Sequence, residues 1–329
     1  MLTKRQNLIE TISGGKPDRY VNQFEFMHIL NCDPLSLTDS WPAYGEENVV
    51  DLWGVTRSYP ENTPGPFPVD TPDRLLCPDV ARWKEYIKAP KLTFSEDIWE
   101  QSLREVEEIN REEEFVTLFM APGLFERMHS FLSMENALMA FYEEPEAVKE
   151  LIRYLEDWEI QYAEKVCEKL HPDCLYHHDD WGSQISTFLS PAMFEEFFLE
   201  SYKRIYSCFK SNGVEVIVHH SDSYAETLVP DMIEMGIDIW QGVMSTNHIS
   251  EMIQKYGGKI TFMGGINSAS VDHPGWTKKE VRDAVEKACR EYGIRYYIPN
   301  TTMGGNYSTF PGVYEEVSEE IRRMSTLLF

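Results

Sequence analysis

The chain has 329 residues, of which 42% are hydrophobic and 13% aromatic, and its formal net charge is −25. This apolar content is sufficient for a packed core and excludes a disordered chain. The negative charge repels nucleic acids and anionic lipid surfaces, so neither is expected as a partner.

The six cysteines are scattered without CxxC pairs, and most lie in apolar or helix-like stretches. This distribution is typical of reduced thiols in a cytosolic protein. The first residues, MLTKRQNLIETISGG, contain no apolar run of signal-peptide length, and 18 apolar residues never occur in a row. We therefore expect a cytoplasmic location and no membrane partner.

The first predicted strand is YVNQFEF (20–26), and VVDLWGV (49–55) is either another strand or the end of a helix. The proline-rich segment 59–78 predicts a long irregular loop, as a lid or an edge of a mouth. From Phe115 onward, short runs rich in β-branched and aromatic residues alternate with longer segments of helical spacing. Six further strands are predicted, at 115–120, 173–178, 214–219, 237–242, 259–264 and 295–300. Pro145, Pro191 and Pro311 are expected at the starts of helices, where a missing N–H costs nothing.

Strands that alternate with helices in this way predict βα units and a parallel sheet. Seven or eight such units in 329 residues fit a closed barrel better than an open doubly wound sheet. No GxGxxG follows the first strand, which weighs against a dinucleotide-binding fold. We therefore predict an α/β protein, a (β/α)8 TIM barrel, in a single domain over residues 1–329 with an N-terminal extension and a long loop.

The carboxyl ends of the strands in such a barrel converge on one face, which holds the active site. Two clusters of polar residues are expected at that face, CLYHHDDWGSQ (174–184) and VEVIVHHSDS (214–223). Neighbouring residues on a strand point to opposite sides, so only one histidine of each pair should point into the barrel. The alternation of apolar residues does not decide which one. His219 with Ser221 and His220 with Asp222 are the two possible sets.

The catalytic candidates from these two clusters are His219, His220, Asp179 and Asp180. Substrate contacts are predicted at other positions near the strand ends, namely Glu25, Phe26, His28, His178, Trp181, Gln184, Trp240, Gln241, Asn267 and Asn300.

Five segments in order along nearly the whole chain carry a family resemblance. They are KRQNLIETISGGKPDRY, APGLFERMHSFLSMENALMAFYEEPEAV, DDWGSQISTFLSPAMFEEFFLESYKRI, VEVIVHHSDSYAETLVPDMIEMGIDIWQGV and ITFMGGIN. Together they resemble the uroporphyrinogen decarboxylase superfamily, and more closely its cobalamin-dependent, methylcobamide-type methyltransferase branch. The resemblance implies a (β/α)8 barrel.

The decarboxylase branch has an arginine-rich segment similar to WxMRQAGR after the first strand, which holds the carboxylates of the substrate. Here FEFMHILNCDP contains no arginine, and PNTTMGGNYS stands where that branch has a GHG histidine. A strongly acidic protein without these donors is not expected to bind an octacarboxylate. Porphyrinogen decarboxylation is therefore not expected.

The methyltransferase branch implies a zinc ion held by an H-x-C motif and by a second cysteine after the last strand. His219 matches the histidine, but Ser221 replaces the first cysteine, and 300–303 contains no second one. If zinc is bound, we expect nitrogen and oxygen ligands, His219 or His220 with Asp222, Asp179 or Glu25. The metal candidates taken from this set are His219 and Asp222.

The resemblance further implies methyl transfer between cobalamin and a small methylated substrate, of aryl ether or methylamine type, or a methyl acceptor. Cobalamin is expected on a separate corrinoid protein, because the chain has no accessible D-x-H-x-x-G sequence. Phe26, Trp181 and Trp240 are expected to stack on an aromatic substrate or to attract a methylammonium group. The alternatives are a decarboxylase-like lyase acting on a small carboxylate and a non-catalytic binding barrel.

Overall fold

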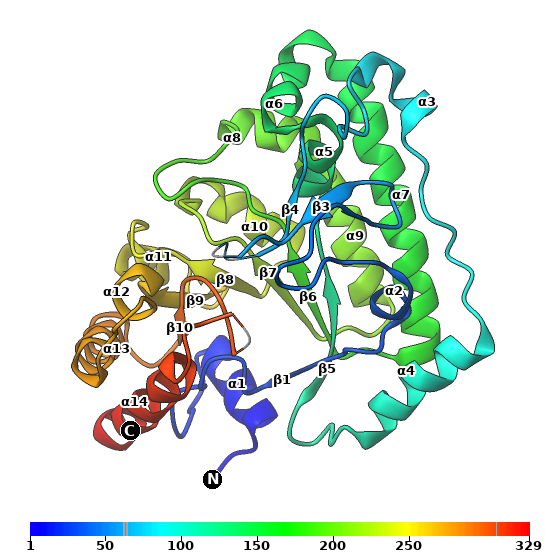
Figure 1. Ribbon diagram of the computed structural model, residues 1–329. Helices are drawn as coiled ribbons and strands as arrows, with labels where there is room; N and C mark the ends of the chain where they lie inside the picture. Colours follow the sequence, from blue (N-terminus) through cyan, green and yellow to red (C-terminus); the bar gives the residue numbers. More distant parts are fainter. Residues whose placement is uncertain (62, 64, 307) are drawn as a thin grey trace.

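A curved sheet of seven parallel strands forms the centre of the computed structural model, which describes residues 1–61, 63, 65–306 and 308–329 (Figure 1). Across the sheet, the strands are β1 (Met27–Ile29), β5 (Phe115–Met120), β6 (Cys174–His178), β7 (Val216–His220), β8 (Ile239–Val243), β9 (Thr261–Ile266) and β10 (Tyr297–Thr301). The outermost strands, β1 and β10, do not pair with each other in this part of the chain. The fold is therefore TIM-like, with seven strands in a curled sheet where the sequence predicted a closed eight-stranded barrel.

Six of the predicted strands occur within two residues of their expected bounds. They are short, β-branched and aromatic, and most of their residues are buried on both faces, as in strands of a covered parallel sheet. The opening strand was predicted too early. Residues 23–26 form a turn in which Gln23 has a φ of 53°, outside the range of a strand, and β1 begins at Met27.

Helices surround the sheet, with α5 to α9 along one side and α11 to α14 along the other (Figure 1). Their bounds are α1 (Lys4–Ser13), α2 (Pro34–Thr38), α3 (Trp83–Tyr86), α4 (Glu96–Glu108), α5 (Leu124–Leu132), α6 (Met134–Glu143), α7 (Pro145–Leu170), α8 (Pro191–Phe194), α9 (Glu200–Ser211), α10 (Val229–Met235), α11 (Ile249–Tyr256), α12 (Ser268–Val271), α13 (Lys278–Tyr292) and α14 (Val313–Leu328). Pro145 and Pro191 begin helices, as predicted. Pro311 lies two residues before α14, because Gly312 caps that helix in a left-handed conformation, with a φ of 88°.

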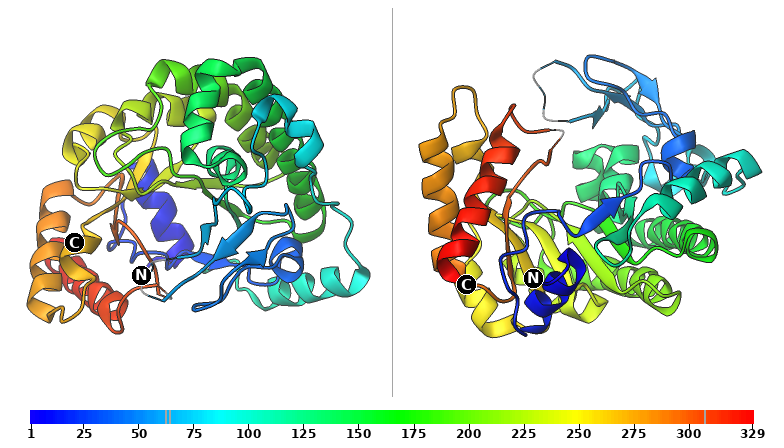
Figure 2. Two further views of the ribbon diagram at one scale, coloured as in Figure 1. Left: turned by 45° about the horizontal axis from the view of Figure 1, so that its top comes forward. Right: turned by 90° about the horizontal axis from the view of Figure 1, so that it is seen from below.

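A small antiparallel sheet stands outside the ring of strands and helices (Figure 2). It consists of β2 (Val49–Val50), β3 (Thr56–Ser58) and β4 (Phe67–Pro68). The segment predicted as a strand or a helix end thus supplies β2 and a turn. The proline-rich segment is irregular in its described residues apart from β4.

One buried arginine ties the small sheet to the helices. The Arg127 guanidinium of α5 lies 4.9 Å from the Trp53 ring and 5.3 Å from the Trp158 ring of α7. Such cation–π contacts stabilise the positive charge of a buried arginine. Trp53 lies in the turn between β2 and β3, so these contacts fix the position of that turn against α5 and α7.

Side chains of the seven-stranded sheet alternate between an inner and an outer core. The inner core contains Phe115, Tyr176, Val218, Met263 and Ile298, whereas their neighbours in sequence pack against the helices. Because this alternation continues to the carboxyl ends of the strands, the last inward positions are Phe119, His178, His220, Gln241 and Asn300.

Among the described residues, no helix combines the length and the apolar character needed to span a membrane.

Candidate functional site

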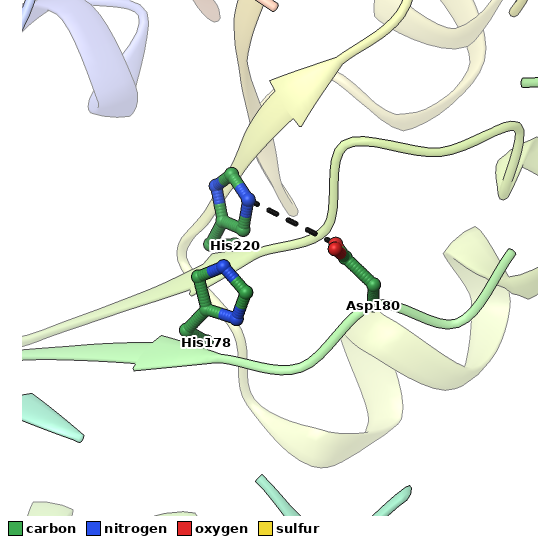
Figure 3. A group of neighbouring side chains, drawn as sticks. All are labelled: His178, Asp180 and His220. Carbon is green, nitrogen blue, oxygen red and sulfur yellow. Dashed lines mark ion pairs between the residues drawn. The ribbon is translucent and has the colours of Figure 1, made fainter. Parts of the chain in front are cut away.

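Two histidines and an aspartate meet at the carboxyl ends of β6 and β7 (Figure 3). His178 and His220 are paired in the register of the two strands, and their rings stack with centroids 4.2 Å apart. Asp180, on the loop after β6, has its Oδ1 atom 3.8 Å from Nε2 of His220. One ligand atom of each residue lies within 4.8 Å of the others, a spacing suited to a metal ion. These residues are called the His–Asp group below.

Each histidine of the His–Asp group has its other ring nitrogen held by a neighbouring side chain. His178 Nδ1 lies 2.8 Å from Oε2 of Glu126 in α5. His220 Nδ1 contacts Oε1 of Gln241 at the end of β8, and the same oxygen accepts a 2.7 Å hydrogen bond from the Tyr176 hydroxyl. Since an amide oxygen only accepts, His220 carries its proton on Nδ1 and directs an unprotonated Nε2 toward Asp180.

The site holds groups whose pKa values are shifted in opposite directions. Burial opposes a charge on His178, but the Glu126 carboxylate outweighs it and raises the pKa of His178 to about 10. Burial, assisted by His178, lowers the pKa of His220 to about 3. Burial and Glu126 raise the pKa of Asp180 to about 6, and burial with Asp180 raises the pKa of Asp222 to about 8. At neutral pH, therefore, His178 is charged, His220 is neutral and Asp222 retains a proton.

The other two histidines of the clusters point away from the site. His219 Nε2 lies 3.1 Å from the carbonyl oxygen of Asp179, and its Nδ1 lies 2.8 Å from the Tyr206 hydroxyl of α9. Tyr206 also contacts His177 Nδ1 at 2.9 Å. Because the carbonyl oxygen can only accept, His219 carries its proton on Nε2, and Tyr206 donates to His219 and accepts from His177. Both nitrogens of His219 are therefore used within the protein.

Asp179 is also directed away from the His–Asp group. Its carboxylate accepts hydrogen bonds from the backbone N–H groups of Phe125 and Glu126, at 3.0 and 2.7 Å, at the first turn of α5. It also accepts a 3.0 Å bond from Trp181 Nε1. A carboxylate at the first turn of a helix satisfies N–H groups that have no partner within the helix. Asp179 thus holds in place the helix that carries Glu126.

Of the two sets left open by the sequence, the structure brings together the one containing His220 and Asp222. The Asp222 backbone N–H donates to Asp180 Oδ1 at 2.9 Å. Ser221, in the other set, is buried and donates or accepts a 2.6 Å bond with Ser223. The predicted metal pair, His219 with Asp222, is not brought together, because both ring nitrogens of His219 are held by Asp179 and Tyr206, whereas Asp222 lies beside Asp180.

The predicted substrate contacts fall into three groups. Gln241, Asn300 and His178 lie at inward positions at the strand ends. Three others are buried outside the site. Phe26 packs on Phe115 in the inner core, Trp240 donates a hydrogen bond to the Ser221 carbonyl, and Trp181 stacks on His219. The remaining predicted residues are Glu25, in the turn before β1, His28, near Glu105 and Glu114, the exposed Gln184, and Asn267, which caps α12.

Three residues that the sequence did not single out complete the site: Glu126, Tyr176 and Phe119. Glu126 follows the predicted strand end at Met120 by six residues, so proximity to a strand end was an available signal. Tyr176 and Phe119 share the inward face of their strands with His178 and with Phe115, respectively. Alternation counted back from the strand ends would have indicated both.

Two hollows on the surface lie apart from the His–Asp group. They border α7 and the segment before α4, the larger with a volume of about 540 Å3. Their linings include Leu92, Thr93 and Lys165, and none of the predicted site residues.

Comparison with known proteins places the chain in a family. The uroporphyrinogen decarboxylase (URO-D) family model matches residues 120–324. No curated protein sequence matches the chain. A methyltransferase from Methanosarcina mazei has a similar structure, with a TM-score of 0.66 and 14% identity over 99% of both chains.

A second solved structure, described as a putative fructose-1,6-biphosphate aldolase from Coccidioides immitis, matches 64% of this chain and 76% of its own. Its TM-score of 0.29 and identity of 10% are too low to support an argument. The family model, in contrast, covers well over half of the chain and both polar clusters. The chain therefore belongs to the uroporphyrinogen decarboxylase family, as its sequence predicted.

Proposed function

We propose that this protein is a methyltransferase that transfers a methyl group between cobalamin, carried by a separate corrinoid protein, and a small methylated substrate or a methyl acceptor. Family membership and the likeness to a methyltransferase along the whole chain support this proposal. The observation that carries it is the convergence of His178, Asp180 and His220 at the carboxyl ends of two strands. In barrel enzymes this face holds the catalytic groups.

The donor atoms of the His–Asp group fit a zinc ion. His178 and His220 each have Nε2 directed away from their Glu126 and Gln241 partners, and Asp180 adds a carboxylate oxygen. Two imidazoles and one carboxylate, with a fourth position open, form a known type of catalytic zinc site. Zinc bound there would polarise the atom that gains or loses the methyl group. Glu126 and Gln241 would fix the orientation of the two rings.

Asp222 is placed to supply a proton to the leaving atom. It is partly exposed, and its backbone N–H is bonded to Asp180, which places Asp222 beside the proposed zinc ligands. When a methyl group leaves an ether oxygen, that oxygen gains negative charge, and a proton transferred to it lowers the barrier. Cobalamin in its reduced form supplies the nucleophile that accepts the methyl group.

A decarboxylase-like lyase is less compatible with this site. The segment FEFMHILNCDP around β1 supplies no arginine to hold the carboxylate of such a substrate. A non-catalytic barrel would not require groups with opposed pKa shifts around one point, a pattern that occurs preferentially at functional sites.

Zinc content and methyl transfer of the purified protein test the proposal together. Methyl transfer to reduced cobalamin from candidate methyl donors is followed by visible absorbance, and zinc by elemental analysis. We expect His220→Ala and Asp180→Asn to lose both bound zinc and at least 100-fold in methyl transfer. His248→Ala, which changes an exposed histidine paired with Glu226, serves as the control. Wild-type values for both measurements in His220→Ala would refute the assignment of the site.

A further inference from the structure

An exposed phenyl ring on a buried strand is unexplained by packing alone. Phe119 is 37% exposed, although its neighbours Leu118 and Met120 on β5 are buried. It points to the inner side of the sheet, as Phe115 does. Strands of a covered parallel sheet bury both faces, so an inward aromatic side chain that solvent reaches is a candidate ligand contact.

The ring of Tyr176 lies against Phe119, and the ring of Phe24 lies against Tyr176. The ring of Phe119 is 5.3 Å from that of Tyr176, and the Tyr176 ring is 5.9 Å from that of Phe24. On its other side, Phe119 meets the His178 ring edge-on at 6.4 Å. The tilted rings at these spacings have the geometry in which aromatic groups attract one another and a further ring. Phe24, Phe119 and Tyr176 are called the aromatic subsite below.

A buried amide donor without a partner borders the same region. Asn300, at the end of β10, is fully buried, and its Nδ2 atom makes no hydrogen bond, whereas its Oδ1 accepts one from Thr301. Asn300 occupies the inward side of β10 with Ile298. The loop after β10 passes the aromatic subsite, since a Cβ atom on Gly305 would lie 3.8 Å from the Phe24 ring. A buried N–H group without a partner calls for a hydrogen-bond acceptor.

We propose that the aromatic subsite and Asn300 bind the aromatic ring of a methoxyarene, with the Asn300 N–H donating to an oxygen on that ring. The proposal rests on the proposed function and narrows the substrate to the aryl ether class. Aromatic rings also attract methylammonium cations, but an N–H donor directed at the same ligand repels a cation and favours an oxygen acceptor. The acids Glu126, Asp180 and Asp222 lie around His178 and His220.

Calorimetric binding without cobalamin tests this subsite apart from catalysis. The ligands are 2-methoxyphenol, 2-methoxycyclohexanol, which keeps the oxygens but lacks the aromatic ring, and tetramethylammonium. We expect 2-methoxyphenol to bind the wild-type protein at least tenfold more tightly than the other two. Phe119→Leu should weaken its binding about 3- to 10-fold, and Phe119→Tyr should leave it within about twofold. Asn300→Leu should weaken it about 3- to 10-fold through the lost hydrogen bond.

Phe329→Leu is the matched control, because Phe329 is a half-exposed ring packed on Tyr20 near the carboxyl terminus, away from the strand ends (Figure 1). It should bind 2-methoxyphenol as the wild-type protein does. The subsite would be overturned if 2-methoxycyclohexanol bound as tightly as 2-methoxyphenol, or if tetramethylammonium bound more tightly. It would also be overturned if 2-methoxyphenol showed no binding at millimolar concentration, or if Phe119→Leu kept the wild-type affinity together with a wild-type circular dichroism spectrum. If 2-methoxyphenol bound more tightly than 2-methoxycyclohexanol but no methyl transfer were detected, the result would support the subsite and contradict the proposed function.

Discussion

Replacing Tyr206 by phenylalanine removes a single oxygen atom that two buried histidines share. The hydroxyl lies 2.9 Å from His177 Nδ1 and 2.8 Å from His219 Nδ1, and all three side chains are fully buried. The variant keeps the ring and its stacking on Tyr202, so it creates no large cavity. It leaves a donor on His177 and an acceptor on His219 without partners, at about 1–3 kcal/mol each. We therefore expect a loss of about 2–6 kcal/mol in the free energy of unfolding.

Urea unfolding followed by circular dichroism measures this loss, with the same m-value expected in both proteins. Tyr142→Phe is the control, because the Tyr142 hydroxyl is exposed and contacts only the Met193 sulfur among the described polar partners. Its stability should change by less than about 0.5 kcal/mol. If Tyr206→Phe were as stable as that control, the hydroxyl would not bridge the two histidines, and the assignment of their protons would fail with it.

Three further predictions concern the site and the helix that supports it. Burial raises the pKa of Asp222 to about 8, above its value of about 3.9 in an unfolded chain, so the folded protein binds this proton more tightly and loses stability as pH rises from 4 to 8. Asp222→Asn should therefore gain stability relative to the wild type across that window and level off above pH 8, and the exposed Asp70→Asn is the control variant. A methyl group on Gly123 would lie 2.6 Å from Cβ of the aspartate that caps α5, so Gly123→Ala should cost about 1–3 kcal/mol in urea unfolding, and Gly65→Ala, with open space around it, less than about 0.5 kcal/mol. Because the pKa of His178 is raised to about 10, zinc must displace a proton from it, so calorimetry in buffers of different ionisation enthalpy should show proton release at pH 7 and affinity that falls with falling pH.

The strands were predictable because their signal is local. Runs such as FVTLFM and VEVIVH are β-branched, aromatic and short, and helical segments separate them, so both type and position follow from the sequence. The position of the first strand was not predictable, because the turn at Gln23 and the pairing of β1 with β5 depend on residues more than 80 positions apart. The number of strands in the sheet is likewise a property of long-range pairing.

The location of the site followed from the sequence, but its membership did not. Strand ends rich in histidine and aspartate were expected to meet at one face, and His178, Asp180 and His220 do meet there. Which histidine points inward depends on the partner that each ring meets, Tyr206 for His219 and Gln241 for His220, and neither partner is adjacent in sequence. Trp181 and Trp240 were assigned to the substrate from residue type alone, yet the indole N–H of each donates a hydrogen bond within the protein.

The unpaired edges of the central sheet determine where members of this family can vary in sequence without disturbing the sheet. Between β1 and β10, in the described part of the chain, no backbone ladder joins the two strands. Phe24 and Asn300 border this seam from its two sides. Substitutions or insertions at this seam can change the space beside the aromatic subsite without breaking an interstrand hydrogen bond. The opposite wall consists of β6, β7 and β8, which are hydrogen-bonded to one another, so similar changes there would break such bonds. Substrate range can thus diverge along the seam while the polar wall is preserved.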